Sequence, residues 1–259
     1  MTARLARTPS CAAAVIVAAA LTAACTNYHE IPIETPIRPK LDVSPFQRVL
    51  VAGFIAGGSE DVDGNLETTR LLRSQLRTKS ELRVIDTDVL PLMEVATEDQ
   101  PAAEAPPVDP ATGTPIIKED ADLERYEHVF ADVDYWKRIG EEYQQPLIVT
   151  GTVMFAPQAR SGIVQRDQEV YDSFGRRRVV PVRTYMERKG FVLRPRFIFI
   201  DGRTGTVLHS ENYREEILYN ANQTSPALSS YFELMDRLIP SFLSTLSSQT
   251  IKGTRILLQ

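Results

Sequence analysis

The chain has 259 residues, of which 43% are hydrophobic and 24% charged. This is the composition of a globular protein with one large domain or two small ones. The formal net charge of −5 becomes −7 without the first 24 residues, which hold Arg4 and Arg7 but no acid. Such an acidic balance argues against a nucleic-acid partner, because nucleic-acid phosphates attract basic surfaces.

The first 24 residues have the pattern of a signal peptide. A basic start precedes Cys11–Leu21, an apolar run of 11 residues, whereas a membrane-spanning helix needs about 20. The segment Leu21-Thr22-Ala23-Ala24-Cys25 resembles a lipobox, in which lipid is attached to the cysteine and the chain is cut before it. Leu21 stands four places before the cysteine and Thr22 three, so the match is imperfect. Ordinary cleavage after Ala20 is the alternative.

Cysteine usage favours the lipoprotein interpretation. Cys11 leaves with the signal peptide, so Cys25 is the one cysteine of the mature chain and has no disulfide partner within it. An acylated Cys25 would hold the protein at a membrane without a spanning helix. We therefore expect a cell-envelope protein. Thr26, rather than Asp, after the cysteine indicates the outer membrane, with the protein facing the periplasm.

The remaining chain divides into a tether and one domain. Residues 25–45 contain Pro32, Pro36 and Pro39, end at Pro45 and show no helical period, which predicts a lipidated, extended tether. Residues 46–259 form the predicted domain. Four prolines among alanines and acids within residues 97–114 predict a disordered insertion over about 97–118. The tail Arg255–Leu258 predicts a short strand.

The first part of the domain predicts a strand, a helix and a second strand. The apolar run Val49–Ile55 predicts a strand buried on both faces. Asn65 is the predicted N-cap of a helix over Leu66–Thr78. A short strand at Leu82–Asp86 would then lie parallel to the first one.

The second part predicts two helices and two long buried strands. Helical spacing of apolar residues indicates one helix over Asp122–Tyr143, and Ser225 and Pro226 start another that runs to Leu246. Between them, Leu147–Phe155 predicts a central strand. In Phe191–Ile200 the aromatic residues share one face, and Ile198, Ile200, Arg194 and Arg196 share the other.

Residues 162–188 predict a long, charged antiparallel hairpin. A turn at 172–175 places Arg176, Arg177 and Arg178 near its tip. A solvated hairpin end is the simpler interpretation of these arginines. With Tyr171, Phe174 and Tyr185 they could also form a contact to an anionic partner or a second copy of the chain. The expected fold is therefore α/β (α+β): a mixed sheet with helices packed on it, plus an extended antiparallel hairpin.

Several short motifs resemble one group of envelope lipoproteins. These are Val49–Ile55, Arg83-Val84-Ile85-Asp86, the stretch PLIVTGTV from Pro146 to Val153 and FIDGRTGTVL from Phe199 to Leu208. In this order they are similar to proteins with a domain like the N-terminal domain of the translocation protein TolB. The curli secretion lipoprotein CsgG and the LpoB-type activators of penicillin-binding proteins are members. The resemblance spans most of Val49–Leu246 and implies an α/β domain that binds or assembles partners and has no shared catalytic residues.

No catalytic or metal-binding motif stands out. His29, His128 and His209 form no metal-ligand pair, and no nucleophile elbow or free cysteine nucleophile is present. The loop Gly53–Ser59 lacks the lysine of a phosphate-binding loop and is followed by acids. We therefore expect no enzyme activity, no metal, no cofactor and no small-molecule substrate.

Three functional interpretations follow. The favoured one is a non-enzymatic envelope accessory in secretion, polymer export or cell-wall synthesis, which binds the membrane through its lipid and other envelope proteins or itself. The second is a CsgG-like oligomeric pore subunit of the outer membrane, with residues 162–188 as a membrane hairpin. Both faces of 162–171 carry charge in their middle, which disfavours membrane insertion. The third is an enzyme whose site one sequence does not reveal.

The lipid anchor is directly testable. Cys25→Ser should abolish labelling by a fatty-acid probe and leave an uncleaved or soluble species. Unchanged labelling would refute acylation at Cys25. Recovery of the wild-type protein from the inner membrane alone would refute the outer-membrane assignment.

Overall fold

The computed structural model describes residues 28–98, 117–220, 223 and 225–258. These residues belong to two compact units. The larger is Pro39–Ser247, and the smaller combines the described parts of the two chain ends, 28–38 and 248–258. Within the described ranges, no helix is both long and apolar enough to cross a membrane.

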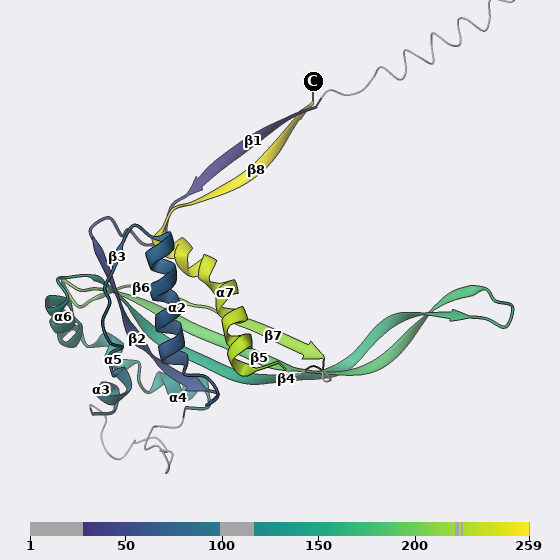
Figure 1. Ribbon diagram of the computed structural model, residues 1–259, viewed down its shortest axis with the longest axis horizontal. Coiled ribbons are helices and arrows are strands. Elements are labelled where there is room, and N and C mark those ends of the chain that lie inside the picture. The colour runs from purple at the N-terminus through teal and green to yellow at the C-terminus, as the bar shows by residue number, and fades with distance from the viewer. Residues whose placement is uncertain (1–27, 99–116, 221–222, 224, 259) are drawn as a thin grey trace, which may run out of the picture. The chain divides into compact units, whose positions relative to one another are not determined.

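The larger unit is built on a mixed sheet with the strand order β3-β2-β4-β5-β6, and β7 also pairs with β5 (Figure 1). The strands β3, β2 and β4 are parallel, and β5, β6 and β7 continue the sheet in antiparallel fashion. Their bounds are Arg48–Gly58 for β2, Arg83–Val84 for β3, Leu147–Tyr171 for β4, Arg177–Asp201 for β5, Val207–Asn212 for β6 and Glu215–Asn220 for β7. The predicted parallel pairing of the first two strands is confirmed.

Helices cover both faces of this sheet (Figure 1). One face packs against α2, Gly64–Lys79, and α7, Ala227–Leu246. The other packs against four short helices: α3, Leu92–Glu98; α4, Asp120–Glu124; α5, His128–Ala131; and α6, Val133–Glu142. The expected fold class, a mixed sheet with packed helices plus an antiparallel hairpin, is confirmed.

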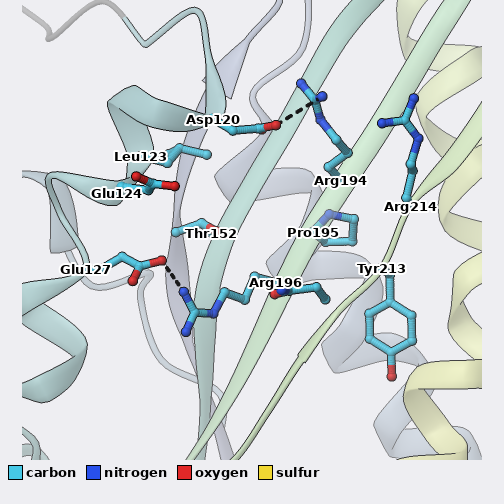
Figure 2. A pocket seen from close by; sticks show the side chains of 11 residues that line it. Asp120, Leu123, Glu124, Glu127, Thr152, Arg194, Pro195, Arg196, Tyr213 and Arg214 are labelled. Carbon is cyan, nitrogen blue, oxygen red and sulfur yellow. Dashed lines mark hydrogen bonds and ion pairs between the residues drawn. The ribbon is translucent and has the colours of Figure 1, made fainter.

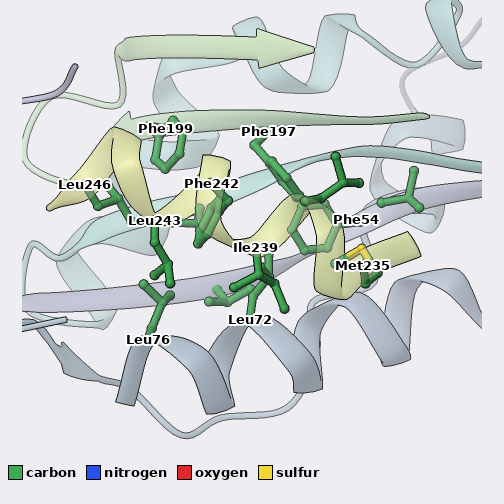
Figure 3. Close-up of a cluster of buried hydrophobic side chains, with 14 of the residues drawn as sticks. Phe54, Leu72, Leu76, Phe197, Phe199, Met235, Ile239, Phe242, Leu243 and Leu246 are labelled. Carbon is green, nitrogen blue, oxygen red and sulfur yellow. The ribbon is translucent and has the colours of Figure 1, made fainter. Parts of the chain in front are cut away.

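Each face carries its own hydrophobic core. Phe197 and Phe199 of β5 pack with Phe242 of α7 (Figure 3). Ile198 and Ile200 belong to the other core, which surrounds Trp136. The predicted division of Phe191–Ile200 into two faces is therefore confirmed. Because successive residues of a strand point to opposite sides, one strand supplies both cores.

The N-cap prediction for the first helix is wrong. Asp63, rather than Asn65, caps α2 by accepting a hydrogen bond from the Leu66 backbone N–H at 2.9 Å. The Asn65 side chain instead accepts from the Phe54 backbone N–H at 2.8 Å. Phe54 follows the β-bulge of β2, where Gly53 has a φ of 133°. Asn65 thus satisfies a donor beside the bulge, where the regular ladder is interrupted.

The single helix predicted over Asp122–Tyr143 is also wrong, because α4, α5 and α6 are separate. Asp132 has ψ 94°, outside the helical region, and its side chain accepts from the Tyr135 N–H as the N-cap of α6. Aspartate favours this capping role over a helix interior. The Trp136 indole N–H donates to the Val129 carbonyl at 2.8 Å, which ties α6 to α5.

The smaller unit is a two-stranded antiparallel sheet. Strand β1, Tyr28–Ile37, pairs along its whole length with β8, Gln249–Leu258. The pairing of β1 within the predicted tether was not foreseen from the sequence, and the strand predicted at Arg255–Leu258 is longer. Pro32 and Pro36 lie four residues apart, so both imide nitrogens face the same edge. Proline is compatible with an edge position because no N–H is needed there.

Most of the predicted insertion, residues 99–116, lies outside the described part of the chain. Its end is ordered: Ile117 is buried in the core around Trp136, and its carbonyl accepts from the Gly58 N–H at 2.9 Å. The boundary at 118 is therefore wrong at this end, because a core residue cannot belong to a disordered segment.

A polar cluster attaches β6 to its neighbours. The Glu211 carboxylate accepts hydrogen bonds from Lys40 and from the Thr245 hydroxyl of α7, the latter at 3.1 Å, and also contacts His209. Burial raises the pKa of Glu211, but the hydrogen bonds from Lys40, Tyr213, His209 and Thr245 lower it more, to about 2 from 4.5. The ionised carboxylate is therefore the form that stabilises this edge of the sheet.

This pKa shift predicts a loss of stability in acid. Because the folded-state pKa lies below the unfolded value, the contribution is complete above pH 4.5 and disappears as the pH falls toward 2. Glu211→Gln should lower the free energy of unfolding at neutral pH by about 1.5–3 kcal/mol and flatten its pH dependence. Urea unfolding at several pH values measures both effects.

Glu187→Gln, at an exposed ion pair, is the control and should change stability little. An unaltered acid dependence in Glu211→Gln would contradict the assignment.

Candidate functional site

The paired strands β4 and β5 continue from the core into an exposed hairpin. Their register runs without a shift from Leu147 opposite Asp201 to Tyr171 opposite Arg177. Beyond Arg188 no other described strand pairs with either of them. We call residues 158–189 the distal hairpin; nearly all of its side chains are exposed. The predicted long hairpin over 162–188 is confirmed.

The tip of the hairpin is organised by Asp172. Its carboxylate accepts from the backbone N–H groups of Phe174 and Arg176, both at 2.9 Å, and from Arg176 Nε at 3.1 Å. The Arg176 backbone N–H is the main cause that keeps the pKa of Asp172 below its usual value. Gly175 supplies the positive φ of 72° that the turn requires.

Each of the three predicted arginines has an acidic partner in the same hairpin. Arg176 and Arg178 lie 3.1 and 3.7 Å from Asp172, and Arg177 lies 2.5 Å from Glu169. The Arg176 guanidinium also lies 5.4 Å from the centre of the Phe174 ring. The positive field at the tip is therefore weaker than the three adjacent arginines suggest.

The six predicted contact residues do not form one surface. Phe174 is at the tip and is 81% exposed, and Tyr171 beside it is 67% exposed. Tyr185 is 66% exposed but lies opposite Ile163, eight residues along β5 from Arg177, or about 26 Å away. Tyr171, Arg177 and Tyr185 share one face of the hairpin, whereas Arg178 lies on the other.

The register separates the charges of the distal hairpin by face. Cross-strand partners share a face, and faces alternate along each strand. We call one face the arginine face; its cross-strand pairs are Arg160/Arg188, Gly162/Met186, Val164/Thr184, Arg166/Val182, Gln168/Val180 and Val170/Arg178. It contains no aspartate or glutamate. Within the described ranges, Arg166 and Arg188 have no ion-pair partner.

The opposite face carries both signs of charge. We call it the mixed-charge face; its pairs are Ala159/Lys189, Ser161/Glu187, Ile163/Tyr185, Gln165/Arg183, Asp167/Pro181, Glu169/Val179 and Tyr171/Arg177. Its three acids balance its three bases. Alternation within each strand is readable from the sequence, but the register that joins the two strands is not, so the arginine face was missed.

A second candidate site is a cleft on the sheet face that α4 and α5 cover (Figure 2). Its volume is about 340 Å³. Three arginines, Arg194, Arg196 and Arg214, line its sheet side, and three acids, Asp120, Glu124 and Glu127, line its helical side. Arg194 Nη1 lies 3.0 Å from Asp120, and Arg196 forms an ion pair with Glu127. A smaller pocket of about 200 Å³ lies on the other side of the Arg196–Glu127 ion pair from the cleft. Its apolar lining residues include Phe130, Ile198 and Val207.

The remaining predicted elements show no catalytic arrangement. Where β2 ends, the N–H groups of Gly58 and Ser59 donate to the carbonyls of Ile117 and Phe155, so they are occupied within the protein. His128 contacts the Arg125 carbonyl, and His209 contacts Glu211. Within the part of the chain that the structure describes, no three His, Cys, Asp or Glu side chains are grouped to hold a metal ion. Cys25 lies outside that part.

No protein-family model matches the chain, and no curated protein matches it. Among solved structures, the chain is similar to lipoprotein GNA1162 from Neisseria meningitidis, with a TM-score of 0.34 and 11% identity over 76% of this chain and 97% of that one. It is also similar to a neuraminyllactose-binding hemagglutinin homologue from Helicobacter pylori, with a TM-score of 0.33 and 9% identity over 80% of this chain and 86% of that one. At these TM-scores neither likeness carries an argument about function.

Proposed function

We propose that this protein is a non-enzymatic lipoprotein of the bacterial cell envelope, anchored through Cys25, that serves as an interaction or assembly accessory in secretion, polymer export or cell-wall synthesis. The distal hairpin is its partner-binding element, and the arginine face is the contact surface for an anionic partner. The observation that supports this best is the segregation of every acid of the paired strands 158–171 and 177–189 onto the opposite face.

Charge is the first argument for this surface. The whole chain has a net charge of −5, yet the arginine face carries Arg160, Arg166, Arg178 and Arg188 without an acid. Arg160 is engaged by Glu216 and Arg178 lies near Asp172, so Arg166 and Arg188 are the cations available to a partner. Complementary charge of this kind increases association rates and selects against wrong partners.

The apolar residues of the same face are the second argument. Val164, Val170 and Val180 are exposed between the arginines, although the hairpin has no core of its own to bury. An isolated two-stranded sheet is marginally stable in water. A partner that covers these valines would therefore stabilise the hairpin as well as bind it. Phe174, at the turn, extends the contact area at the tip.

The pore interpretation has no comparable support. The middle of the arginine face holds Arg166 and Gln168, and the middle of the mixed-charge face holds Asp167 and Arg183. Both faces thus place charge where a membrane hairpin needs an apolar surface.

The arginine face predicts a salt-sensitive association. Replacing Arg166 and Arg188 together by serine should weaken recovery of partners from envelope extracts several-fold at about 0.05 M salt, and the difference should disappear toward 0.5 M. The fold should remain intact, since substitutions at exposed sites change stability by about 0.5 kcal/mol or less. Pull-down with quantitative mass spectrometry over a salt series measures the effect.

The matched control is Arg183→Ser, an exposed arginine on the mixed-charge face that also has no ion-pair partner in the described ranges. It should leave recovery close to the wild-type level. Equal losses from both variants, or none from either, would show that the arginine face is not the contact surface.

A further inference from the structure

The cleft beside α4 contains two like charges in direct opposition. Strands β6 and β7 follow the same register along β5, with Asn212 opposite Arg196 and Glu215 opposite Leu193. Between them the Tyr213 N–H donates to the Pro195 carbonyl at 2.9 Å. Arg214 therefore lies directly across from Arg194. Like charges at directly opposed positions of a sheet are destabilising.

The protein neutralises these two guanidinium groups incompletely. Asp120 engages Nη1 of Arg194, while Nε of Arg194 is buried and has no hydrogen-bond partner among the described atoms. Arg214 has Glu216 at 3.6 Å, but Glu216 is also bound at 3.0 Å by Arg160. An arginine offers five N–H donors, so these ion pairs leave donors of both guanidinium groups unsatisfied. Figure 2 shows the Arg194 and Arg214 side chains extending toward the same end of the cleft.

The helical wall of the cleft is acidic. Glu124 lines the cleft, is exposed, and has no ion-pair partner within 4.0 Å among the described residues. Glu127, one helical turn further along the chain, is paired with Arg196. An unpaired carboxylate thus stands across the cleft from two incompletely neutralised guanidinium groups.

We propose that this cleft binds a small zwitterion of the size of an amino acid or dipeptide. Its carboxylate would be held between Arg194 and Arg214, where it relieves their repulsion. Its ammonium group would face Glu124. The inference goes beyond the proposed function and does not depend on the hairpin.

Charge and size select this class of ligand. The carboxylate fits the forked donors of an arginine, whereas a dianionic phosphate has no ammonium group to face the unpaired Glu124 and would be repelled by it. The volume of about 340 Å³ is at the lower end of small-molecule sites. The Arg196–Glu127 ion pair lies between the cleft and the adjoining pocket. That pocket, lined by Phe130, Ile198 and Val207, can take an apolar side chain of a ligand that extends beyond the ion pair.

The test is calorimetric titration of the chain from Thr26 onward, which keeps both described units. The probes are alanyl-alanine, its C-terminal amide, its N-acetyl derivative and inorganic phosphate. We expect saturable binding of alanyl-alanine. The amide, which lacks the carboxylate, should bind at least tenfold more weakly, and the N-acetyl derivative, which lacks the ammonium group, should also bind with lower affinity. Inorganic phosphate should bind more weakly than the dipeptide.

Three variants locate the site. Arg214→Gln should weaken alanyl-alanine at least tenfold but leave the affinity for its amide unchanged, since the contact to the carboxylate is already absent there. Glu124→Gln should also weaken the binding of alanyl-alanine at least tenfold. It should leave the affinity for the N-acetyl derivative unchanged, since that probe has no ammonium group to face Glu124. Arg237→Gln, at an ion pair on α7 with similar exposure to Arg214, is the control and should bind as the wild type does. The proposal is overturned by the absence of dipeptide binding, by preferential binding of phosphate, or by equal affinities in all variants.

Discussion

The antiparallel ladder between β4 and β5 is the element on which the other features depend. It keeps one register from Leu147 opposite Asp201 to Tyr171 opposite Arg177. Because side chains alternate between faces, a slip of one residue in either strand would move all its side chains to the other face. In the buried half this would exchange residues between the two cores. In the exposed half it would place the acids of one strand beside the arginines of the other. The same pairing therefore determines the fold and the charge of the hairpin surface.

The cleft is a local consequence of the same ladder. Thr152 of β4 lies opposite Arg196 of β5, and Pro195 has no N–H to donate to the next strand. The strand that covers β5 is interrupted at Tyr213 and Arg214, yet keeps its register on both sides. A row of arginines is thus held on a rigid sheet face, while short helices bring acids above it. The protein balances most of this charge internally but leaves Glu124 and part of Arg214 to a ligand.

The features predicted from the sequence are those encoded by local patterns. The alternation in Phe191–Ile200 predicts both cores, and the turn residues around Gly175 predict the hairpin. Features that depend on distant partners were missed. The pairing of β1 with β8 joins distant segments of the chain, and Asn65 binds the backbone beside the β-bulge of β2 while Asp63 caps α2. The tip arginines were identified, but their partners Asp172 and Glu169 depend on the turn and the register. The cleft has no local signal, since its walls come from separate elements.

The most direct test of the account compares neighbouring residues on the two faces of the hairpin. Val179, on the mixed-charge face, and Val180, on the arginine face, are 56% and 42% exposed and adjacent in β5. The two positions lie at nearly the same distance from the tip of the hairpin. A photo-crosslinking amino acid placed at each of them in living cells therefore reports which face contacts a partner. The account predicts a defined adduct from position 180 that is much weaker from position 179. Adducts of equal strength from both positions, or from position 179 alone, would contradict it.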